Sequence, residues 1–263
     1  MLKFFRKIRQ RLLTENKLSR YFLYAIGEIF LVVIGILIAL SINNWNEERK
    51  DSLIEQNYLR RLLIDLESDY KTLTFSKDLS KDRIDQIKTL TDVIDNPSMT
   101  DRNSIEIITS LEKVTWRSYL PLSKIVYDEL LSSGNMSLIQ SEELRNFLSS
   151  YYVDADHWEM ILNLEDAQKE FSHETAGILS IEILTAIENS SSLRNSKPIN
   201  QMDIDLEEEE INRIVHEFSS RSDATKWLPQ IHHYHTLAEK VITNLSAQNE
   251  AIQELVKGEL RNR

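Results

Sequence analysis

YFLYAIGEIFLVVIGILIALSI, residues 21–42, is a nearly unbroken apolar run whose one charged side chain is Glu28. An α-helix rises about 1.5 Å per residue and needs about 20 apolar residues to cross the hydrocarbon core of a bilayer. The polar residues 43–46 close the run at its C-terminal end. The run therefore predicts a single membrane-spanning helix.

The charges on either side of this run predict its orientation. Seven of the first twenty residues are Lys or Arg, against one acid, Glu15. Basic residues beside a first span are retained in the cytoplasm, so we expect the N-terminus inside. Tyr21, Tyr24 and Trp45 suit the aromatic belts at the two membrane surfaces. We predict a cytoplasmic basic segment over 1–20, a transmembrane helix over 21–43 and an extracytoplasmic domain over 44–263.

Two alternatives apply to the N-terminal region. Its apolar stripe of Leu2, Phe5, Ile8 and Leu12 is also typical of an interfacial helix, although a plain anchor accounts for the same charges. The small residues Ala39 and Ser41 resemble the end of a cleavable signal peptide. Because the apolar run is long and continues past that point to Ile42, we favour a retained anchor.

The composition predicts an acidic, almost wholly helical domain. The chain has a net charge of −11, and since the first twenty residues contribute +6, the rest carries −17. Such a domain is a poor partner for nucleic acid, whose phosphates require Lys and Arg. The chain has no Cys, which excludes disulfides and thiolate metal ligands. Its 5 Gly and 4 Pro leave little room for phosphate-binding loops or tight hairpins.

Apolar residues at alternating steps of three and four predict the long helices. One such seam comprises Leu59, Leu63, Leu66, Tyr70, Leu73, Ile84, Ile87 and Ile94, and it is interrupted by Lys77, Ser80 and Thr91. It predicts a helix over 47–95 that ends at Asn96–Pro97. We also predict long helices from Ser141 to about 189 and over 227–255, with short ones near 105–111, 123–132 and 211–218. The last long helix has Pro229 in its first turn, and its predicted seam comprises Trp227, Ile231, Tyr234, Ala238, Val241, Leu245, Gln248, Ile252 and Leu255. The predicted fold is all-α: one transmembrane helix followed by an elongated antiparallel helical bundle with heptad-like seams.

The candidate functional residues of the span are Glu28, Gly35 and Ala39. An ionisable group in a span is rare and often functional. Gly35 and Ala39 form a small-residue surface on which helices can pack closely. Three interpretations of Glu28 remain open: a carboxylate that snorkels to the headgroups, a group paired in an oligomer or partner interface, and a proton-coupled carboxylate.

Outside the span, the strongest candidate is a recognition turn at Gly134 and Asn135, with Trp116 and Tyr119 as nearby aromatic residues. The glycine predicts a left-handed helix cap. His232, His233 and His235 have a spacing that suits metal binding, but their position beside the seam predicts exposed helix surface. We therefore predict no metal, no cofactor and no catalytic residues.

Three segments resemble a known family: FFRKIRQRLLTENK (4–17), YAIGEIFLVVIGILIALSINNWNEERK (24–50) and YDELLSSGNMSLIQSEELRNFLSSYY (127–152). The first two resemble the N-terminal signature of a family of single-pass membrane proteins common in Bacteroidetes, a domain of unknown function. The resemblance implies a bacterial inner (cytoplasmic) membrane and a periplasmic helical domain. It implies no established chemistry and no catalytic residues.

Three function hypotheses follow. The preferred one is a non-enzymatic, membrane-anchored interaction or scaffold protein that forms a homo-oligomer or binds other membrane or periplasmic proteins. The second is a periplasmic ligand-sensing bundle that acts through a partner. The third is an enzyme, a hydrolase or metalloenzyme, for which the sequence contains no catalytic constellation. A proton-coupled subunit that uses Glu28 is a less favoured variant.

Overall fold

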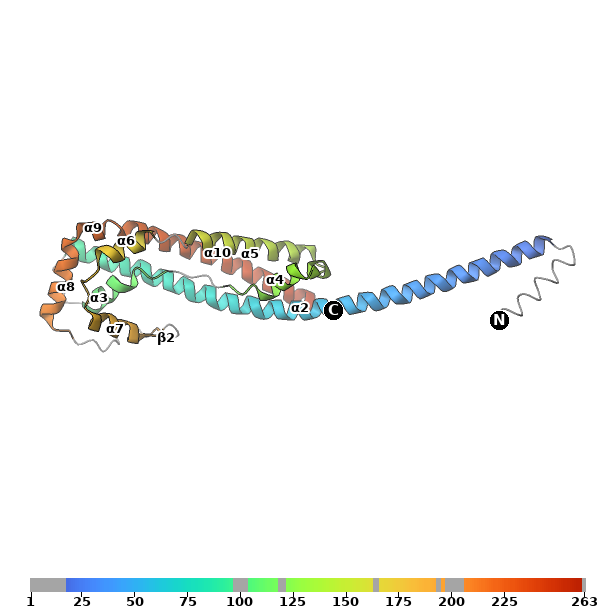
Figure 1. The fold of residues 1–263 in the computed structure, drawn as a ribbon, viewed down its shortest axis with the longest axis horizontal. Helices are drawn as coiled ribbons and strands as arrows, with labels where there is room; N and C mark the ends of the chain where they lie inside the picture. Colours follow the sequence, from blue (N-terminus) through green and yellow to red (C-terminus); the bar gives the residue numbers. More distant parts are fainter. Residues whose placement is uncertain are drawn as a thin grey trace. The chain divides into compact units, whose positions relative to one another are not determined.

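The computed structural model describes residues 18–96, 104–117, 122–162, 166–192, 195–196 and 206–261 (Figure 1). It is all-α, as predicted, apart from the two-residue strands β1 (Ser191–Ser192) and β2 (Asn195–Ser196), which pair antiparallel. The helices are α2 (Leu18–Asp95), α3 (Ser104–Lys113), α4 (Ile125–Ser132), η2 (Asn135–Leu138), α5 (Glu142–Leu162), α6 (Asp166–Glu174), α7 (Ile181–Ser190), α8 (Glu208–Ser220), α9 (Ser222–Thr225) and α10 (Leu228–Arg261).

The chain divides into two compact units, Met1–Asn57 and Tyr58–Arg263. In the first unit, the described residues belong to α2, and its large apolar side chains from Phe22 to Ile42 are exposed. Within the described part of the chain, α2 is the one helix long and apolar enough to cross a membrane, by length and composition.

Helix α2 ends where the sequence predicts. Its last residue is Asp95, and the N–H of Asn96 still donates to the carbonyl of Asp92 at 2.9 Å. The next residue is Pro97, and a residue that precedes proline is disfavoured in the α conformation. The prediction of a helix from 47 to 95 is therefore confirmed at its C-terminal end, and the same helix extends back to Leu18.

The buried seam of α2 differs from the predicted one. The structure buries Leu59, Leu62, Leu66, Asp69, Leu73, Ser76, Ser80, Arg83, Ile87 and Leu90, at strictly alternating steps of three and four. The prediction chose Leu63 and Tyr70 because they are apolar, but both are only partly buried. It also treated Ser80 as an interruption. The three-and-four spacing of the buried seam is unbroken because buried polar side chains fill the positions in its middle.

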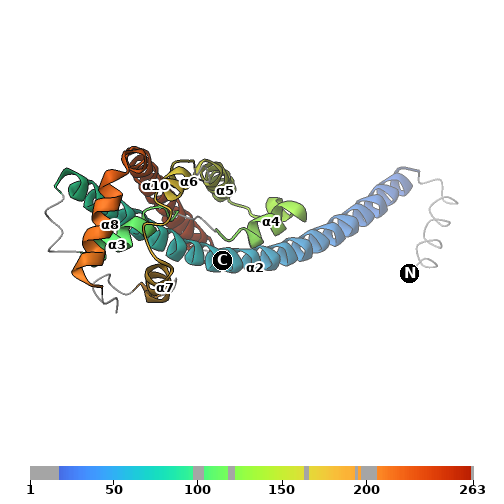
Figure 2. The ribbon, with the colours of Figure 1, turned by 60° about the vertical axis from the view of Figure 1, so that its left-hand side comes forward.

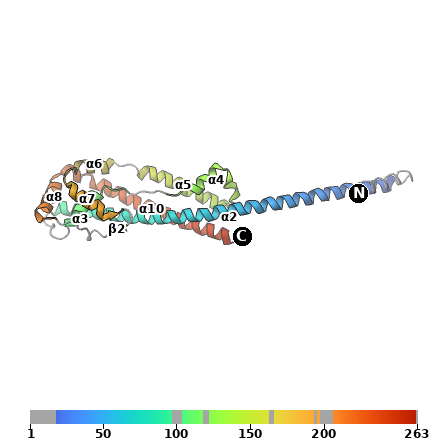
Figure 3. The same ribbon diagram turned by 60° about the horizontal axis from the view of Figure 1, so that its bottom comes forward.

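The core of the second unit consists of two apolar clusters. The first joins α2 near residues 58–73 to α4, α5 and α10, and Figures 1 and 3 show α5 and α10 alongside this part of α2. The second joins the end of α2 to residues of α3, α6, α7, α8, α9 and the start of α10. Figure 2 shows α3 and α8 near the C-terminal end of α2, the part of this helix that belongs to the second cluster. Burial of each Leu, Ile or Phe contributes about 1.5–3 kcal/mol.

The predicted helix from Ser141 to 189 is three helices. Ser141 does cap its start, since its hydroxyl accepts the N–H of Leu144 at 3.2 Å. Helix α5 ends at Leu162, however, and α6 and α7 are separated by a turn in which Gly177 has φ +81°. This left-handed conformation interrupts a helix, and glycine adopts it without strain. The short helices predicted near 105–111, 123–132 and 211–218 correspond to α3, α4 and α8.

Helix α10 carries the last seam, shifted from the predicted one. Pro229 lies in its first turn, as predicted, where its missing N–H removes no intrahelical bond. The buried positions run at alternating steps of three and four through Leu228, Ile231, His235, Ala238, Ile242, Leu245, Asn249, Ile252 and Val256. The prediction used Tyr234 and Gln248, whereas the structure buries the adjacent polar residues His235 and Asn249.

Candidate functional site

The three candidate residues of the apolar stretch lie on the exposed surface of α2. The side chains of Glu28 and Ala39 are exposed, and a Cβ added to Gly35 has no atom within 4 Å. Gly35 and Ala39 are one helical turn apart, so they lie on the same face of α2. Among the described residues, this face is open to close approach by another helix.

The predicted turn at Gly134 forms beside α2. Gly134 has φ +73°, the left-handed conformation that the sequence predicts. The side-chain amide of Asn135 donates to the hydroxyl of Tyr58 at 2.9 Å, and this hydroxyl donates to Glu129 at 3.2 Å. Arg61 also pairs with Glu129, which lowers the pKa of this carboxyl, chiefly through the hydrogen bond. The turn is thereby held against α2 by polar contacts.

Trp116 lies elsewhere. Its ring centroid is 5.4 Å from the guanidinium carbon of Arg83 and 5.8 Å from the Nζ of Lys113. Arg83 and Tyr58 are 25 residues apart on α2, about 37 Å at 1.5 Å per residue. The structure therefore does not bring Trp116 together with Gly134 and Asn135. The fourth residue of the predicted surface, Tyr119, lies outside the described residues.

Arg83 occupies the polar middle of the α2 seam. Its side chain is 4% exposed, and its Nη1 donates to Asp82 at 2.5 Å and to the Oε1 of Gln86 at 3.1 Å. Its Nε has no hydrogen-bond partner among the described residues. Burial lowers the pKa of this guanidinium, and the Asp82 carboxylate opposes that shift. Asp82 itself is 47% exposed.

His235 of α10 faces the same layer. The residue is completely buried, and neither ring nitrogen has a hydrogen-bond partner among the described residues. Burial first, and then the positive charge of Arg83, lowers the pKa of the imidazole to about 3. The nearby backbone of Val114 offsets part of this shift without reaching hydrogen-bond geometry. His235 is therefore neutral, and its predicted position on the exposed helix surface is wrong, whereas His232 and His233 are exposed.

A second buried polar group lies in the first apolar cluster, around Asp69. Its carboxylate accepts the backbone N–H of Ser123 and the hydroxyl of Tyr151, the latter at 3.5 Å. Asp65 accepts the N–H of Val126 at 3.2 Å, so two acids of α2 cap the N-terminal end of α4. Burial raises the pKa of Asp69 to about 7, although the Ser123 hydrogen bond opposes this shift.

The polar network continues from Tyr151 into α10. Asn249 donates to the Tyr151 hydroxyl at 3.0 Å, and Gln253 donates to Asn249 at 2.7 Å. Gln253 also reaches the carbonyl of Leu66 in α2 at 3.5 Å. This chain of hydrogen bonds links α2, α5 and α10. Buried polar residues of this kind fix the register of packed helices.

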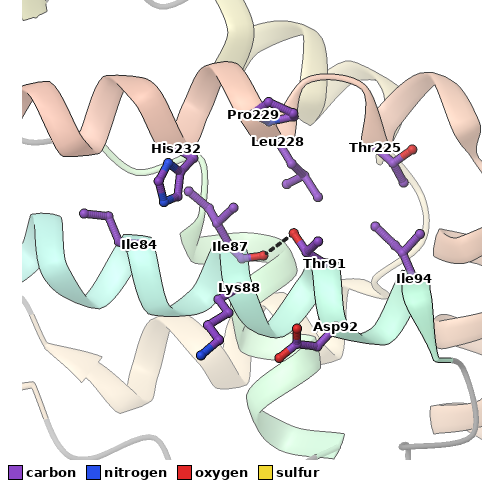
Figure 4. A pocket seen from close by; sticks show the side chains of 10 residues that line it. All are labelled: Ile84, Ile87, Lys88, Thr91, Asp92, Ile94, Thr225, Leu228, Pro229 and His232. Carbon is purple, nitrogen blue, oxygen red and sulfur yellow. Dashed lines mark hydrogen bonds between the residues drawn. The ribbon is translucent and has the colours of Figure 1, made fainter.

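A cavity of about 630 Å³ opens at the second apolar cluster (Figure 4). It is lined by Ile84, Ile87, Lys88, Thr91, Asp92, Ile94, Thr225, Leu228, Pro229 and His232. In Figure 4, Leu228 and Thr225 point toward the isoleucine side chains of α2, whereas Lys88 and Asp92 point away from α10. The volume and the mostly apolar lining suit a small apolar ligand.

The described residues contain no group of three or more His, Asp or Glu side chains placed to hold a metal ion. The predicted seams leave out Asp69, Arg83, His235 and Asn249, because these seams consist almost wholly of apolar residues. A signal was available, since the three-and-four spacing continues through all four positions.

The described residues define an all-α protein that has one helix apolar enough to cross a membrane and a helical core with buried polar side chains. The chain belongs to a family of unknown function, DUF6090, whose model matches residues 28–206. No curated protein matches the chain, and no solved structure does. Membership of a family of unknown function is thus confirmed, whereas the Bacteroidetes origin stays a prediction.

Proposed function

We propose that this protein is a membrane-anchored, non-enzymatic interaction or scaffold module. The observation that carries this proposal is the single helix α2, which contains both the apolar stretch and the first seam of the folded core. An apolar helix that exposes side chains such as Phe30, Leu37 and Leu40 to water is strongly disfavoured, and a lipid bilayer removes this penalty.

The proposed location is the inner (cytoplasmic) membrane of a bacterium, with the N-terminus in the cytoplasm and residues 44–263 in the periplasm. The excess of Lys and Arg in the first twenty residues supports this orientation. The acidic remainder of the chain is compatible with translocation, since acidic residues contribute little to orientation.

We further propose that the helices of the second unit form an elongated antiparallel bundle with coiled-coil-like seams. The contacts between α2 and α10 support this arrangement, because Leu66 is reached by Gln253 whereas Ile84 and Ile87 line one cavity with Leu228. Residues later in α2 are thus close to residues earlier in α10, as is expected of antiparallel helices.

Anchoring is tested by extraction of isolated membranes with alkaline carbonate, which releases peripheral proteins but not spanning ones. We expect the full chain to stay in the membrane and a variant without residues 1–43 to be released. Added protease should reach the C-terminal domain in spheroplasts but not in intact cells. A full chain released by carbonate, or a domain protected in spheroplasts, contradicts the proposal.

The proposed partner of the apolar stretch is a second copy of the chain, with Gly35 and Ala39 at the contact. Substitution Gly35→Ile should disrupt close packing, because the larger side chain fills the space into which the second helix fits. Gly27 provides a matched control, since a Cβ there also has no atom within 4 Å and it lies about 80° around the helix from Gly35.

The measurement is crosslinking in membranes. We expect dimers in the wild type and in Gly27→Ile, and monomers in Gly35→Ile. An unchanged yield in Gly35→Ile contradicts a contact at this face. A wild type that forms neither self-adducts nor adducts with other proteins overturns the interaction proposal as a whole.

A second candidate function, ligand sensing through a partner, is supported by the cavity at α2 and α10. Its lining residues belong partly to α2, the helix that also contains the apolar stretch. Indole is a suitable apolar probe. We expect it to raise the melting temperature of the wild type in a saturable way and to have no such effect in Thr91→Phe, which fills the cavity.

Thr243→Phe is the control for this test. Both threonines are exposed and donate to the carbonyl four residues earlier, so their substitution has similar local effects on the helix. Thr243 does not line the cavity. An equal response of the two variants to indole argues against a binding site there.

A further inference from the structure

The layer between the two apolar clusters contains two cations in close proximity. We define the cationic cluster as Arg83, Lys113, Trp116 and His235. Arg83 and Lys113 lie against the same indole ring, 5.4 and 5.8 Å from its centroid. Both residues are buried, and burial first, then the charge of Arg83, lowers the pKa of the Lys113 ammonium.

The charge of this cluster is not balanced. Asp82 is the carboxylate that pairs with Arg83, and its side chain is 47% exposed. The Nζ of Lys113 forms no hydrogen bond or ion pair with any other described side chain, although the Asp82 carboxylate also acts on this ammonium and opposes the lowering of its pKa. A cation on a largely buried side chain without a paired carboxylate is unfavourable, because burial removes part of its hydration.

The cluster also contains hydrogen-bonding atoms without partners. The Nε of Arg83 and both ring nitrogens of His235 are buried and unpaired among the described residues. Buried polar atoms in proteins are almost always satisfied, and exceptions point to a role or to a bound group. A neutral imidazole supplies one N–H donor, and the Nε of arginine supplies another.

An anion accounts for both observations. We propose that the cationic cluster binds a small oxyanion, the phosphate or carboxylate group of a ligand, between Arg83 and Lys113. The planar guanidinium binds such groups through paired donors, and the ammonium adds a point charge. The indole of Trp116 lies against both cations and is itself half-buried, so it forms the outer wall of the proposed site. The site is separate from the apolar cavity, and the proposal depends neither on anchoring nor on dimer formation.

The test uses the full-length protein in detergent with inorganic phosphate and, in a separate arm, sodium acetate, each at constant ionic strength against chloride. We expect a saturable rise in melting temperature with one of the two. The arm that responds distinguishes a phosphate site from a carboxylate site. Because phosphate also stabilises proteins by exclusion from their surface, the decisive comparison is between variants.

Lys113→Gln should weaken the binding at least tenfold, because it removes one of the two cations. Lys226→Gln is the matched control: Lys226 also lies over an indole ring, 5.5 Å from the centroid of Trp227, but it is exposed and paired with Asp223. This variant should bind as the wild type does. If Lys113→Gln fails to fold, Trp116→Phe provides the second variant, since it keeps both cations and removes part of the outer wall.

A second measurement distinguishes anion binding from a purely structural role of the cationic cluster. A bound anion reverses part of the effect of Arg83 on the imidazole, so the NMR titration of His235 should move to higher pH when the ligand is added. Absence of any saturable response to phosphate and acetate overturns the proposal. An equal response in Lys113→Gln and the wild type does so as well.

Discussion

The side-chain amide of Asn249 in α10 donates a hydrogen bond to the hydroxyl of Tyr151 in α5 at 3.0 Å, and both residues are completely buried. This contact lies within an otherwise apolar cluster and is connected to the carboxylate of Asp69. A hydrogen bond inside an apolar cluster restricts how the helices can align. If one helix shifts along the other, a buried donor or acceptor is left unpaired.

The coupling between Asn249 and Tyr151 is measurable by a double-mutant cycle. We expect Asn249→Leu and Tyr151→Phe each to lower the free energy of unfolding by about 1–3 kcal/mol, since each leaves a buried partner unsatisfied. The double variant should lose less than the sum, by at least about 0.5 kcal/mol. Urea denaturation provides the values.

Tyr234→Phe is the control for that cycle, because the Tyr234 hydroxyl bonds the carbonyl of Leu162 and lies 15 residues before Asn249 on α10. Its effect should add to that of Asn249→Leu within about 0.5 kcal/mol. Strict additivity in both pairs is incompatible with a coupled network.

The register of α2 is tested by two neighbouring leucines. Leu62 is completely buried, whereas Leu63 is only partly buried. Leu62→Ala should cost about 2–5 kcal/mol of unfolding free energy, because it leaves a cavity in the first apolar cluster. Leu63→Ala should cost clearly less. The opposite order would support the seam predicted from apolar residues alone.

The raised pKa of Asp69 predicts that the free energy of unfolding depends on pH. Between about pH 4 and 7 the folded carboxyl keeps its proton while the unfolded one is ionised, since the folded pKa is about 7. The folded state then binds more protons, so its stability falls as the pH rises through this range. Asp69→Asn should remove this dependence.

The measurement for Asp69 is the unfolding free energy at pH 4.5 and 7.5. The advantage of the wild type over Asp69→Asn should be greater at the lower pH. Glu129→Gln is the control, because Arg61 lowers the pKa of Glu129 from its ordinary value of 4.5, so the stabilisation by this carboxylate is largely present at both pH values and is lost only at lower pH. A pH-independent difference for Asp69→Asn refutes the assignment.

His235 should act in the direction opposite to Asp69. Its folded pKa is about 3, so between about pH 3 and 6.5 the unfolded chain binds a proton that the folded chain does not. Stability contributed by this residue is therefore lost as the pH falls. His235→Phe should reduce that loss, with little effect near neutral pH, because the imidazole has no hydrogen bond to lose among the described residues. Acid titration of both proteins by circular dichroism gives the comparison, and parallel curves would contradict it.

Gly134 and Gly258 should respond oppositely to alanine. A Cβ has space at both positions, so sterics with neighbours do not distinguish them. Gly134 has φ +73°, and alanine there should cost about 1–2 kcal/mol. Gly258 lies inside α10, where alanine should stabilise the helix by about 0.5–1 kcal/mol. Thermal melting measures both stability changes. A Gly134→Ala variant as stable as the wild type would indicate that the turn adopts another backbone conformation without cost.

The sequence predicted much of the fold because local signals determined it. The end of α2 before Pro97, the cap at Ser141, Pro229 in the first turn of α10 and the left-handed Gly134 all depend on backbone chemistry within a few residues. The break at Gly177 was missed because an isolated glycine in a helical pattern does not by itself indicate a turn.

The candidate sites were less predictable. The face of Gly35 and Ala39 can be recognised from spacing within one helix. The pairing of Arg83 with Trp116, or of Asp69 with the start of α4, joins residues far apart in the chain. No pattern within a single helix specifies such a contact, so the predicted seam leaves out Asp69 and Arg83.

By itself, the sequence determined the helical class, the apolar stretch and most helix ends, because hydrophobic length, proline and glycine act locally on the backbone. The tertiary structure alone decided which seam positions are buried. Packing selects positions by geometry, and Asp69, Arg83, His235 and Asn249 occupy buried positions although their side chains are polar. Asp69 and Asn249 have hydrogen-bond partners on other helices, Arg83 is bound by Asp82 and Gln86 of its own helix, and the unsatisfied atoms of Arg83 and His235 motivate the proposed anion site.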